Sequence, residues 1–290
     1  MRRPVAAACV VTLGLIVAAC GSGKPPHSLF DAAGYHVRDD TVFYLEAFPG
    51  EAVEMAGADA ASFQALDRTF ARDRGSVYVD GRRLEEADPG SFELLDRQDF
   101  ARDRSHVFRR DRIVSDDPAH FALLDGDLTR DDRAVYWSDG RVLSQDPANF
   151  AIVSNTGSYL FTKDSAAVHV NGGVIAGADP ATFRVLQGAY GQDARQVYYF
   201  ADAVAGADAA TFRPLEGPYA KDDTRAYWMG KPVPGADPAS FRVLNADFEC
   251  SSDRARAYYR DAVIAGADPA SFPPGVAVTN CSATSISFAG

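Results

Sequence analysis

The chain has 290 residues and a formal net charge of −11 at pH 7. This acidic balance argues against binding to nucleic acid or adsorption to anionic lipid, because both require a basic surface. Apolar residues make up 47% of the sequence, enough to form a large core, which argues against a disordered chain.

The start of the chain has the three parts of an export signal. Two arginines form a short basic segment, residues 5–17 are apolar but too few for a comfortable membrane span, and small residues precede Cys20. This arrangement resembles a bacterial lipoprotein signal, which implies that Cys20 becomes a lipidated N-terminus that anchors the chain to a membrane. The alternative is an ordinary signal peptide with an incidental cysteine. We predict a signal peptide at residues 1–19 and a flexible tether at residues 20–34.

A five-residue motif of the form Asp-Pro-Ala-Ser-Phe then recurs, with variation, eight times. Its phenylalanines lie 29 positions apart, except for one step of 33 and one of 31: Phe63, Phe92, Phe121, Phe150, Phe183, Phe212, Phe241 and Phe272. A period in this range indicates a repeat architecture. Asp can cap a short helical turn and Pro fits its first position. Each copy is therefore expected to bury a phenylalanine, which contributes roughly 1.5–3 kcal/mol.

One repeat unit is expected to contain three short strands. In residues 70–98, a strand at residues 77–79 returns through Asp80-Gly81, a strong hairpin signal, and residues 92–95 open the strand that runs into the next unit. The first turn of each unit carries an aspartate: Asp73, Asp103, Asp131, Asp164, Asp193, Asp222 and Asp253. Five positions later lies a mostly aromatic column: Tyr78, Phe108, Tyr136, His169, Tyr198, Tyr227 and Tyr258. The returning strand is expected to place one apolar residue in the core: Leu84, Val114, Val142, Ile175, Val204, Val233 and Ile264.

Residues 193–199 and 222–228 resemble the repeat of the DKNYY family. That repeat has an Asp-Lys-Asn stretch, a Tyr-Tyr pair, a Gly turn and an Ala-Asp-Pro-x-Thr/Ser-Phe segment. No copy here has the literal Lys-Asn pair, and His169 replaces one tyrosine, so the similarity is to the pattern. It covers roughly residues 35–275. The resemblance implies a bacterial envelope-associated repeat protein and brings no catalytic residues.

We expect an all-β fold, a tandem array of about eight hairpin-based repeats at residues 35–275 with a capping tail at residues 276–290. Atypical first and last units are what an open array needs. The alternative is a closed β-propeller, whose blades usually have four strands and about 40–50 residues. Units of 29 residues with three strands favour the open array.

Two cysteines remain beyond the signal and the lipid site, Cys250 and Cys281. An even pair in an exported protein favours a disulfide, which would join the tail to the last repeat and stabilise it by roughly 3–4 kcal/mol. The alternatives are two free thiols or a metal site, and no Cys/His cluster supports the latter.

Catalytic motifs are missing from the sequence. It has no Gly-x-Ser-x-Gly, no phosphate-binding Gly-Lys loop, no His-Glu-x-x-His and no Cys-x-x-Cys. The acidic pairs Asp39-Asp40, Asp131-Asp132 and Asp222-Asp223 are expected in solvated turns; calcium is the alternative, but the ordered spacing of a calcium loop is missing. We predict no enzymatic activity, no cofactor and no metal, with a glycan hydrolase as the weakest hypothesis.

An aromatic residue directly follows the aromatic column in four repeats: Trp137, Tyr199, Trp228 and Tyr259. Neighbouring side chains on a strand point to opposite faces, so these four would form an exposed row that contacts a sugar or a protein. The alternative is that both faces of each hairpin are buried between layers.

The leading hypothesis is a lipid-anchored envelope protein that acts as a non-catalytic binding or scaffolding module. The alternative is a cell-wall carbohydrate-binding module that uses the aromatic row. The expected partners are the membrane, through the lipid on Cys20, and an envelope protein or cell-wall glycan, with no nucleic acid. The resemblance to a lipoprotein signal further implies, from Gly21 after the cysteine, a location at the outer membrane, facing the periplasm or the surface, in a cell that has one.

Overall fold

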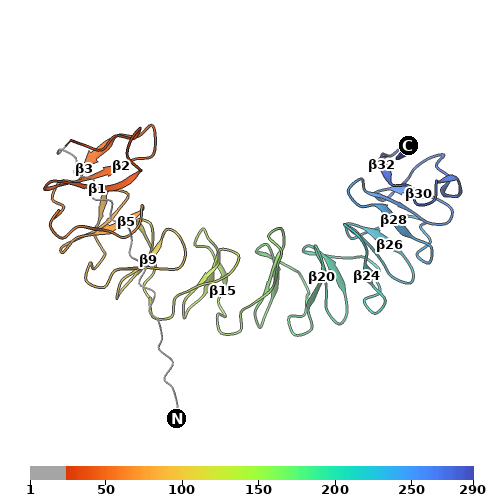
Figure 1. Ribbon diagram of the computed structural model, residues 1–290. Coiled ribbons are helices and arrows are strands. Elements are labelled where there is room, and N and C mark those ends of the chain that lie inside the picture. Colours follow the sequence, from red (N-terminus) through yellow and green to blue (C-terminus); the bar gives the residue numbers. More distant parts are fainter. Residues whose placement is uncertain (1–23) are drawn as a thin grey trace, which may run out of the picture. The chain divides into compact units, whose positions relative to one another are not determined.

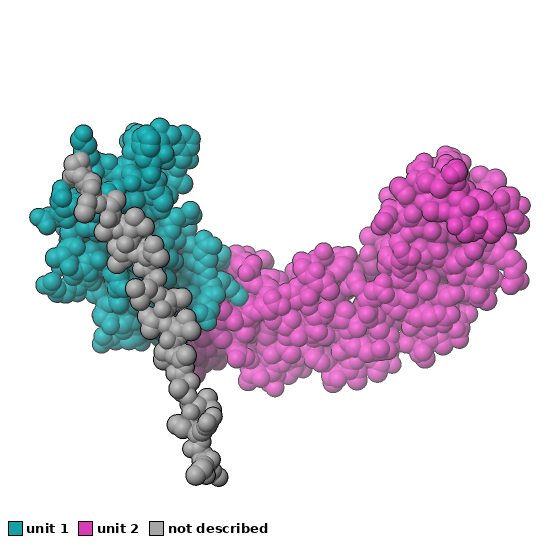
Figure 2. Space-filling view, in the orientation of Figure 1, with its two compact units in different colours: residues 1–118 teal, residues 119–290 magenta. Residues whose placement is uncertain are grey.

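Antiparallel sheets of very short strands make up most of the structure. The computed structural model describes residues 24–290 and divides into two compact units, which meet in the sequence at Pro118 and Ala119 (Figure 1, Figure 2). The predicted signal peptide and the lipidation site Cys20 lie outside the described residues. In the part that is described, no helix is both long and apolar enough to cross a membrane.

The first unit contains one three-stranded and two four-stranded sheets, each with its strands in chain order. The first sheet comprises β1 (Gly34–Arg38), β2 (Thr41–Leu45) and β3 (Ala52–Glu54). The second comprises β4 (Gln64–Ala65), β5 (Phe70–Arg72), β6 (Val77–Val79) and β7 (Arg82–Leu84). The third comprises β8 (Glu93–Leu94), β9 (Phe100–Arg102), β10 (Val107–Arg109) and β11 (Arg112–Ser115).

The second unit contains five four-stranded sheets and a terminal two-stranded sheet. Its first two sheets comprise β12 (Ala122–Leu123), β13 (Thr129–Arg130), β14 (Val135–Tyr136), β15 (Val142–Ser144), and β16 (Ala151–Asn155), β17 (Leu160–Lys163), β18 (Val168–Val170), β19 (Gly173–Val174). The next two comprise β20 (Arg184–Gln187), β21 (Tyr190–Gln192), β22 (Val197–Tyr199), β23 (Asp202–Ala203), and β24 (Arg213–Pro214), β25 (Tyr219–Lys221), β26 (Ala226–Trp228), β27 (Lys231–Pro232). The last comprise β28 (Arg242–Asn245), β29 (Cys250–Ser252), β30 (Ala257–Tyr259), β31 (Ala262–Val263), and β32 (Val278–Cys281), β33 (Ile286–Phe288), with a 3-10 turn η1 (Pro269–Ser271) before β32.

The predicted hairpin turn at Asp80-Gly81 is confirmed. β5, β6 and β7 pair in register, with Phe70 opposite Val79 and Val77 opposite Leu84. Asp80 and Gly81 have φ angles of 47° and 76°, the left-handed conformation that a tight two-residue hairpin turn requires. Asp and Gly tolerate this conformation at the lowest cost, so the local sequence selects the turn.

The prediction of three strands per unit is wrong for seven repeats, which are four-stranded meanders; the first repeat, β1–β3, does have three strands. The missed turn lies between the first two strands, where the Asp67 carboxylate accepts hydrogen bonds from the amides of Thr69 and Phe70 at 2.8 and 2.6 Å. In this copy the turn contains neither Gly nor Pro and separates strands of two or three residues. The equivalent turns of four later repeats do contain a glycine: Gly126, Gly157, Gly188 and Gly217. The predicted all-β tandem array is nevertheless confirmed, since no sheet of the described residues closes into a barrel.

The residue predicted to be buried on the returning strand is wrong in two repeats. Val142 was expected in the core but is 52% exposed, while Ser144 is 4% exposed and takes the buried position. A bulge between Val135 and Tyr136 shifts the register, so that Val135 pairs with Ser144. The same bulge in β10 pairs Val107 with Ser115 and displaces Val114 from the core position. An extra residue in the hairpin therefore reassigns which side chain is buried.

The motif phenylalanines bridge consecutive repeats. The Phe212 ring lies 5.4 Å from the Tyr190 ring of its own repeat and 5.5 Å from the Tyr227 ring of the next. Phe183 and Phe241 occupy equivalent positions between two aromatic rings. Because each sheet is too small to bury its own face, the core is formed between neighbouring sheets.

Candidate functional site

The aspartate in the turn between the second and third strands of each four-stranded repeat is here named the hub aspartate. It accepts hydrogen bonds and is buried in six of the seven repeats. Asp222 is 1% exposed. Its Oδ1 accepts from the amides of Thr224 and Arg225, both at 2.7 Å. Its Oδ2 accepts from the Tyr227 hydroxyl at 2.6 Å and from the amide of Asp208, the motif residue that ends the preceding repeat, at 3.0 Å. One carboxylate thus joins a turn, a core tyrosine and the neighbouring motif.

The same geometry recurs in both units. The hub-to-tyrosine bond is 2.6–2.9 Å long in three further repeats: Asp73 with Tyr78, Asp193 with Tyr198, and Asp253 with Tyr258. The expectation of solvated acidic turns is therefore wrong for Asp131 and Asp222, which are buried, and holds for their exposed neighbours Asp132 and Asp223. Such a carboxylate has little capacity left for catalysis or metal binding.

Hydrogen bonding keeps the hub carboxylates ionised. Burial opposes the charge of Asp222, but bonds from the Tyr227 hydroxyl and the Asp208 amide outweigh it and lower the pKa of Asp222 to about 2. In three further hub aspartates burial likewise opposes the charge, but hydrogen bonds outweigh it and lower the pKa: Asp73, Asp193 and Asp253. Burial, together with the adjacent carboxylate, raises the pKa of the partner tyrosines to about 12: Tyr78, Tyr198 and Tyr258.

These pKa shifts predict a stability that falls at both extremes of pH. A hub aspartate stabilises the fold fully above its ordinary pKa of 3.8, and this contribution is lost as the pH falls through the folded value, about 2 for Asp222. A hub tyrosine contributes fully below its ordinary pKa of 10, and this contribution is lost as the pH rises through about 12. Urea unfolding followed by circular dichroism over this range tests the prediction, and an unchanged midpoint between about pH 4 and pH 2 would contradict it.

The motif aspartates cap single helical turns, as predicted. Asp268 precedes η1, and its side chain accepts a hydrogen bond from the Ala270 amide at 2.9 Å, with Pro269 at the first position of the turn. Asp237 accepts likewise from the Ala239 amide at 3.1 Å and from the Ser240 hydroxyl at 2.6 Å. These acids are therefore used as caps.

A long polar side chain on the second strand reaches the motif that ends its own repeat. Lys221 Nζ donates to the carbonyls of Pro238 and Phe241 at 2.9 and 3.1 Å. Four more side chains donate to carbonyls equivalent to that of Pro238: Arg72 to Pro89, Arg102 to Pro118, Lys163 to Pro180, and Gln192 to Ala209. These bonds satisfy carbonyls of the short turn and hold each sheet to the motif that leads to the next sheet.

One repeat departs from this pattern around Asp164. His169 stands in the tyrosine column, and its Nδ1 is buried without a hydrogen-bond partner among the described residues. In place of a tyrosine hydroxyl, the Ser144 hydroxyl of the preceding repeat donates a hydrogen bond to Asp164 Oδ2 at 2.5 Å. Ser144 also accepts from the Asp146 amide at 3.0 Å. Burial lowers the pKa of His169, and the charge of Asp164 only partly opposes this shift.

The four aromatic residues predicted as contacts are half-buried. Tyr199 packs edge-on against Tyr190, with ring centroids 4.8 Å apart. The indole nitrogen of Trp228 is buried without a hydrogen-bond partner among residues 24–290, and the Arg260 guanidinium lies 5.6 Å from its ring and 4.9 Å from that of Tyr259. Three of the four thus already contact other side chains: Trp228 is approached by Arg260 of the next repeat, whereas Tyr199 and Tyr259 make these contacts within their own repeats. Their contact with a partner stays a prediction.

Trp137 differs, because it lines an open cleft of about 560 Å³ in the second unit. The cleft, here named the Trp137 cleft, lies between the turn that precedes β13 and the turn that precedes β17. Its polar lining comes from Asp125, Asp127, Asn155 and Asn171. It brings one aromatic ring, two carboxylates and two amides together.

Two irregular turns accompany this cleft. In a regular repeat, the residue after the core tyrosine pairs with the residue three positions later, as Tyr199 does with Asp202. In the β14–β15 hairpin the equivalent residue is Trp137, whose amide bonds to the Arg141 carbonyl, four positions later, at 2.9 Å, so the tip is longer. The next repeat contains the 33-residue step, and four residues separate the paired positions Asn155 and Leu160.

Glycines let the two repeats approach on either side of the cleft. A Cβ on Gly172 would lie 2.4 Å from Trp137 Nε1, and a Cβ on Gly126 would lie 2.8 Å from the Leu160 side chain. Both glycines have positive φ angles, 79° and 69°. The Trp137 ring therefore rests on bare backbone, which sets its position.

Sequence reasoning predicted Trp137 but missed the polar residues around it. The break in the period was the available signal, since Asn155 lies within the 33-residue step. Asp125, Asp127 and Asn171 come from two other turns, which only the fold brings together.

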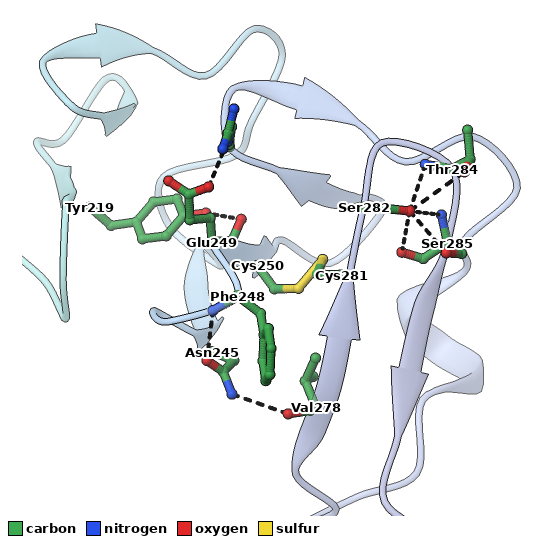
Figure 3. Close-up of a disulfide and its surroundings, with 11 residues drawn as sticks. Tyr219, Asn245, Phe248, Glu249, Cys250, Val278, Cys281, Ser282, Thr284 and Ser285 are labelled. Carbon is green, nitrogen blue, oxygen red and sulfur yellow. Dashed lines mark hydrogen bonds and ion pairs between the residues drawn. A yellow bond between two sulfur atoms is a disulfide. The ribbon is translucent and has the colours of Figure 1, made fainter.

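Cys250 and Cys281 form a disulfide that joins β29 to β32 (Figure 3). Their Cα atoms are 6.0 Å apart. Beside it, Asn245 Nδ2 donates to the Val278 carbonyl at 3.1 Å, and the Phe248 amide donates to Asn245 Oδ1 at 3.1 Å. The tail is therefore attached to the last four-stranded sheet both covalently and by hydrogen bonds.

Reduction of this disulfide is expected to destabilise the last repeat by about 2–4 kcal/mol, because it releases a closed loop. The two cysteines are 31 positions apart. Hydrogen exchange of β28–β33 with and without reductant measures the loss. A Cys250→Ser/Cys281→Ser variant is the control: it should already show the loss and respond no further to reductant. Equal protection before and after reduction would contradict the prediction.

The chain matches the DKNYY family over residues 70–202 and 219–274, more than half of its length. The matched residues contain every hub aspartate from Asp73 to Asp253. Neither a curated protein nor a solved structure matches the chain.

Proposed function

Since this chain belongs to the DKNYY family, we propose that it is a non-catalytic repeat module, held at a bacterial membrane by a lipid on Cys20, that binds a partner in the cell envelope. The observation that carries the non-catalytic part is the use of the acidic side chains. Hub and motif aspartates recur in repeat after repeat as hydrogen-bond acceptors for turns, caps and tyrosines.

Repetition itself supports a binding role. An active site needs a unique arrangement of groups, whereas repeat arrays present extended surfaces built from equivalent positions. The export signal and Cys20 support the envelope location, since a lipid anchor leaves the rest of the chain in water.

A second candidate function is binding of cell-wall carbohydrate. One observation favours it: Trp137 lines a cleft whose other walls carry carboxylates and amides. The other three residues of the predicted aromatic row already pack against other side chains, so this candidate is confined to a single site.

Membrane fractionation and cross-linking in intact cells test the main proposal. The wild-type chain should sediment with membranes and recover a near-stoichiometric envelope partner after cross-linking. Cys20→Ala is the matched control, because it removes the anchor site without touching the described residues 24–290, and it should lose both. Retention of Cys20→Ala in the membrane fraction would contradict the anchor, and recovery of no partner would contradict the scaffold role.

A further inference from the structure

We propose that the Trp137 cleft binds a short, uncharged oligosaccharide. This inference rests on the proposed function as an envelope binding module and names the ligand class that one site would take. The cleft volume of about 560 Å³ lies in the range of small-molecule sites, roughly 300–1,000 Å³.

The charge of the lining selects against anions. Asp125 and Asp127 line the cleft, and no Lys or Arg of the described residues does. An anionic ligand would meet the exposed Asp127 carboxylate, and no cation of the lining would offset that repulsion. The ligand is therefore neutral or positively charged.

The hydrogen bonds around the cleft favour a neutral ligand over a metal ion. The two oxygens of Asp125 accept from the Gly126 amide at 2.8 Å and from Asn155 Nδ2 at 3.0 Å. Among residues 24–290, the Asp127 carboxylate makes no hydrogen bond or ion pair, which leaves one uncommitted acidic group. A hard cation such as Ca²⁺ needs six to eight oxygen ligands, many more than one free carboxylate provides.

The remaining groups suit a sugar ring. Sugar hydroxyls both donate and accept, so they can pair with a carboxylate and with the amide of asparagine. The indole of Trp137 offers a flat apolar surface for the C–H face of the ring, as aromatic anchors do in binding sites.

The polar wall is held in place before any ligand arrives. Asn155 Oδ1 accepts from the Gly157 amide at 3.0 Å. Asn171 accepts from the Leu160 amide at 2.8 Å and donates to the Ser158 carbonyl at 3.1 Å. A site that is already ordered loses less conformational entropy on binding.

The two tryptophans of the chain provide the test, because they report on different places. In the full-length Trp228→Phe variant, all tryptophan emission comes from Trp137 in the cleft. In Trp137→Phe it comes from Trp228, which packs against the core of its repeat. The probe is the tetramer of β-1,4-linked N-acetylglucosamine, an uncharged glycan of the kind expected in a cell wall.

Titration with the tetramer should shift the emission of Trp228→Phe saturably and leave that of Trp137→Phe unchanged. Asp127→Ala, added to the Trp228→Phe background, should weaken binding roughly tenfold, because it removes the uncommitted carboxylate. Asp127 is exposed but has a left-handed φ of 59°, so circular dichroism must first show that the variant keeps the wild-type fold. Asp139→Ala is the matched control: this exposed acid lies in the same repeat but outside the cleft, and its removal should change affinity less than about twofold.

Absence of a saturable shift in Trp228→Phe would overturn the inference, as would equal effects of Asp127→Ala and Asp139→Ala. A shift produced by CaCl₂ alone would also overturn it, in favour of a cation site. The proposed envelope function is judged separately by the Cys20→Ala fractionation. A failed titration with anchoring and partner recovery intact would therefore remove only the sugar site.

Discussion

Asp222→Ala is expected to lower the stability of its repeat by about 3–5 kcal/mol, because it removes a buried charged acceptor and leaves its donors without a partner. The Tyr227 hydroxyl and the amides of Asp208 and Arg225 all point at this carboxylate. Native-state hydrogen exchange across β24–β27 measures the loss locally, which matters because long repeat arrays need not unfold in two states.

Asp223→Ala is the matched control for this variant. Asp223 is the next residue, is exposed, and faces Arg213 at 3.9 Å. An exposed pair at this distance contributes little, so the loss should stay below about 1 kcal/mol. Comparable losses in Asp222→Ala and Asp223→Ala would contradict the role of the hub aspartate.

Phe212→Ala is also expected to cost about 3–5 kcal/mol, the usual range for removing a buried phenylalanine. Phe212 is 8% exposed and lies between the rings of Tyr190 and Tyr227. Since these rings belong to successive repeats, its loss should weaken the contact between them, and protection should fall in β20–β23 as well as in β24–β27.

Phe200→Ala provides the comparison, because it removes a phenylalanine that is not buried between two repeats. Phe200 is 36% exposed at a hairpin tip, where it touches the rings of Tyr159 and Tyr199. We expect a loss of only about 1 kcal/mol, because the ring is partly exposed, although Tyr159 belongs to the preceding repeat. A Phe212→Ala effect confined to one sheet would show that the motif phenylalanine does not couple repeats.

Turns and caps that depend on a few neighbouring residues were predicted correctly. Asp268 caps a turn that starts with Pro269, and Asp80-Gly81 turns a hairpin, as expected from each segment read alone. Both depend on bonds and dihedral angles within a few residues, so local chemistry is sufficient. The turn at Asp67 escaped detection because it relies on an Asp side chain, without Gly or Pro, between strands too short to show a period.

The buried state of Asp222 illustrates the opposite case. Its column was visible in the sequence, yet the acidic pair with Asp223 suggested a solvated turn. One of its donors, the amide of Asp208, lies 14 positions earlier, in the preceding motif. A carboxylate is buried at acceptable cost only when such donors converge, and their convergence depends on how successive sheets pack.

The sequence by itself determined the period, the all-β repeats, the capped turns and the disulfide partners of this protein, because these follow from residue type, spacing and short-range geometry. Only the tertiary structure decided which residues of a column are buried and where a cleft opens. A bulge between Val135 and Tyr136 buries Ser144 in place of Val142. Two irregular turns carry Trp137 and Asn155, and a third turn brings Asp125 to the same cleft. The pairing register and the turn length decide which face of a sheet each side chain takes. A change of one residue in either therefore alters which residues are buried, and this cannot be read from one segment alone.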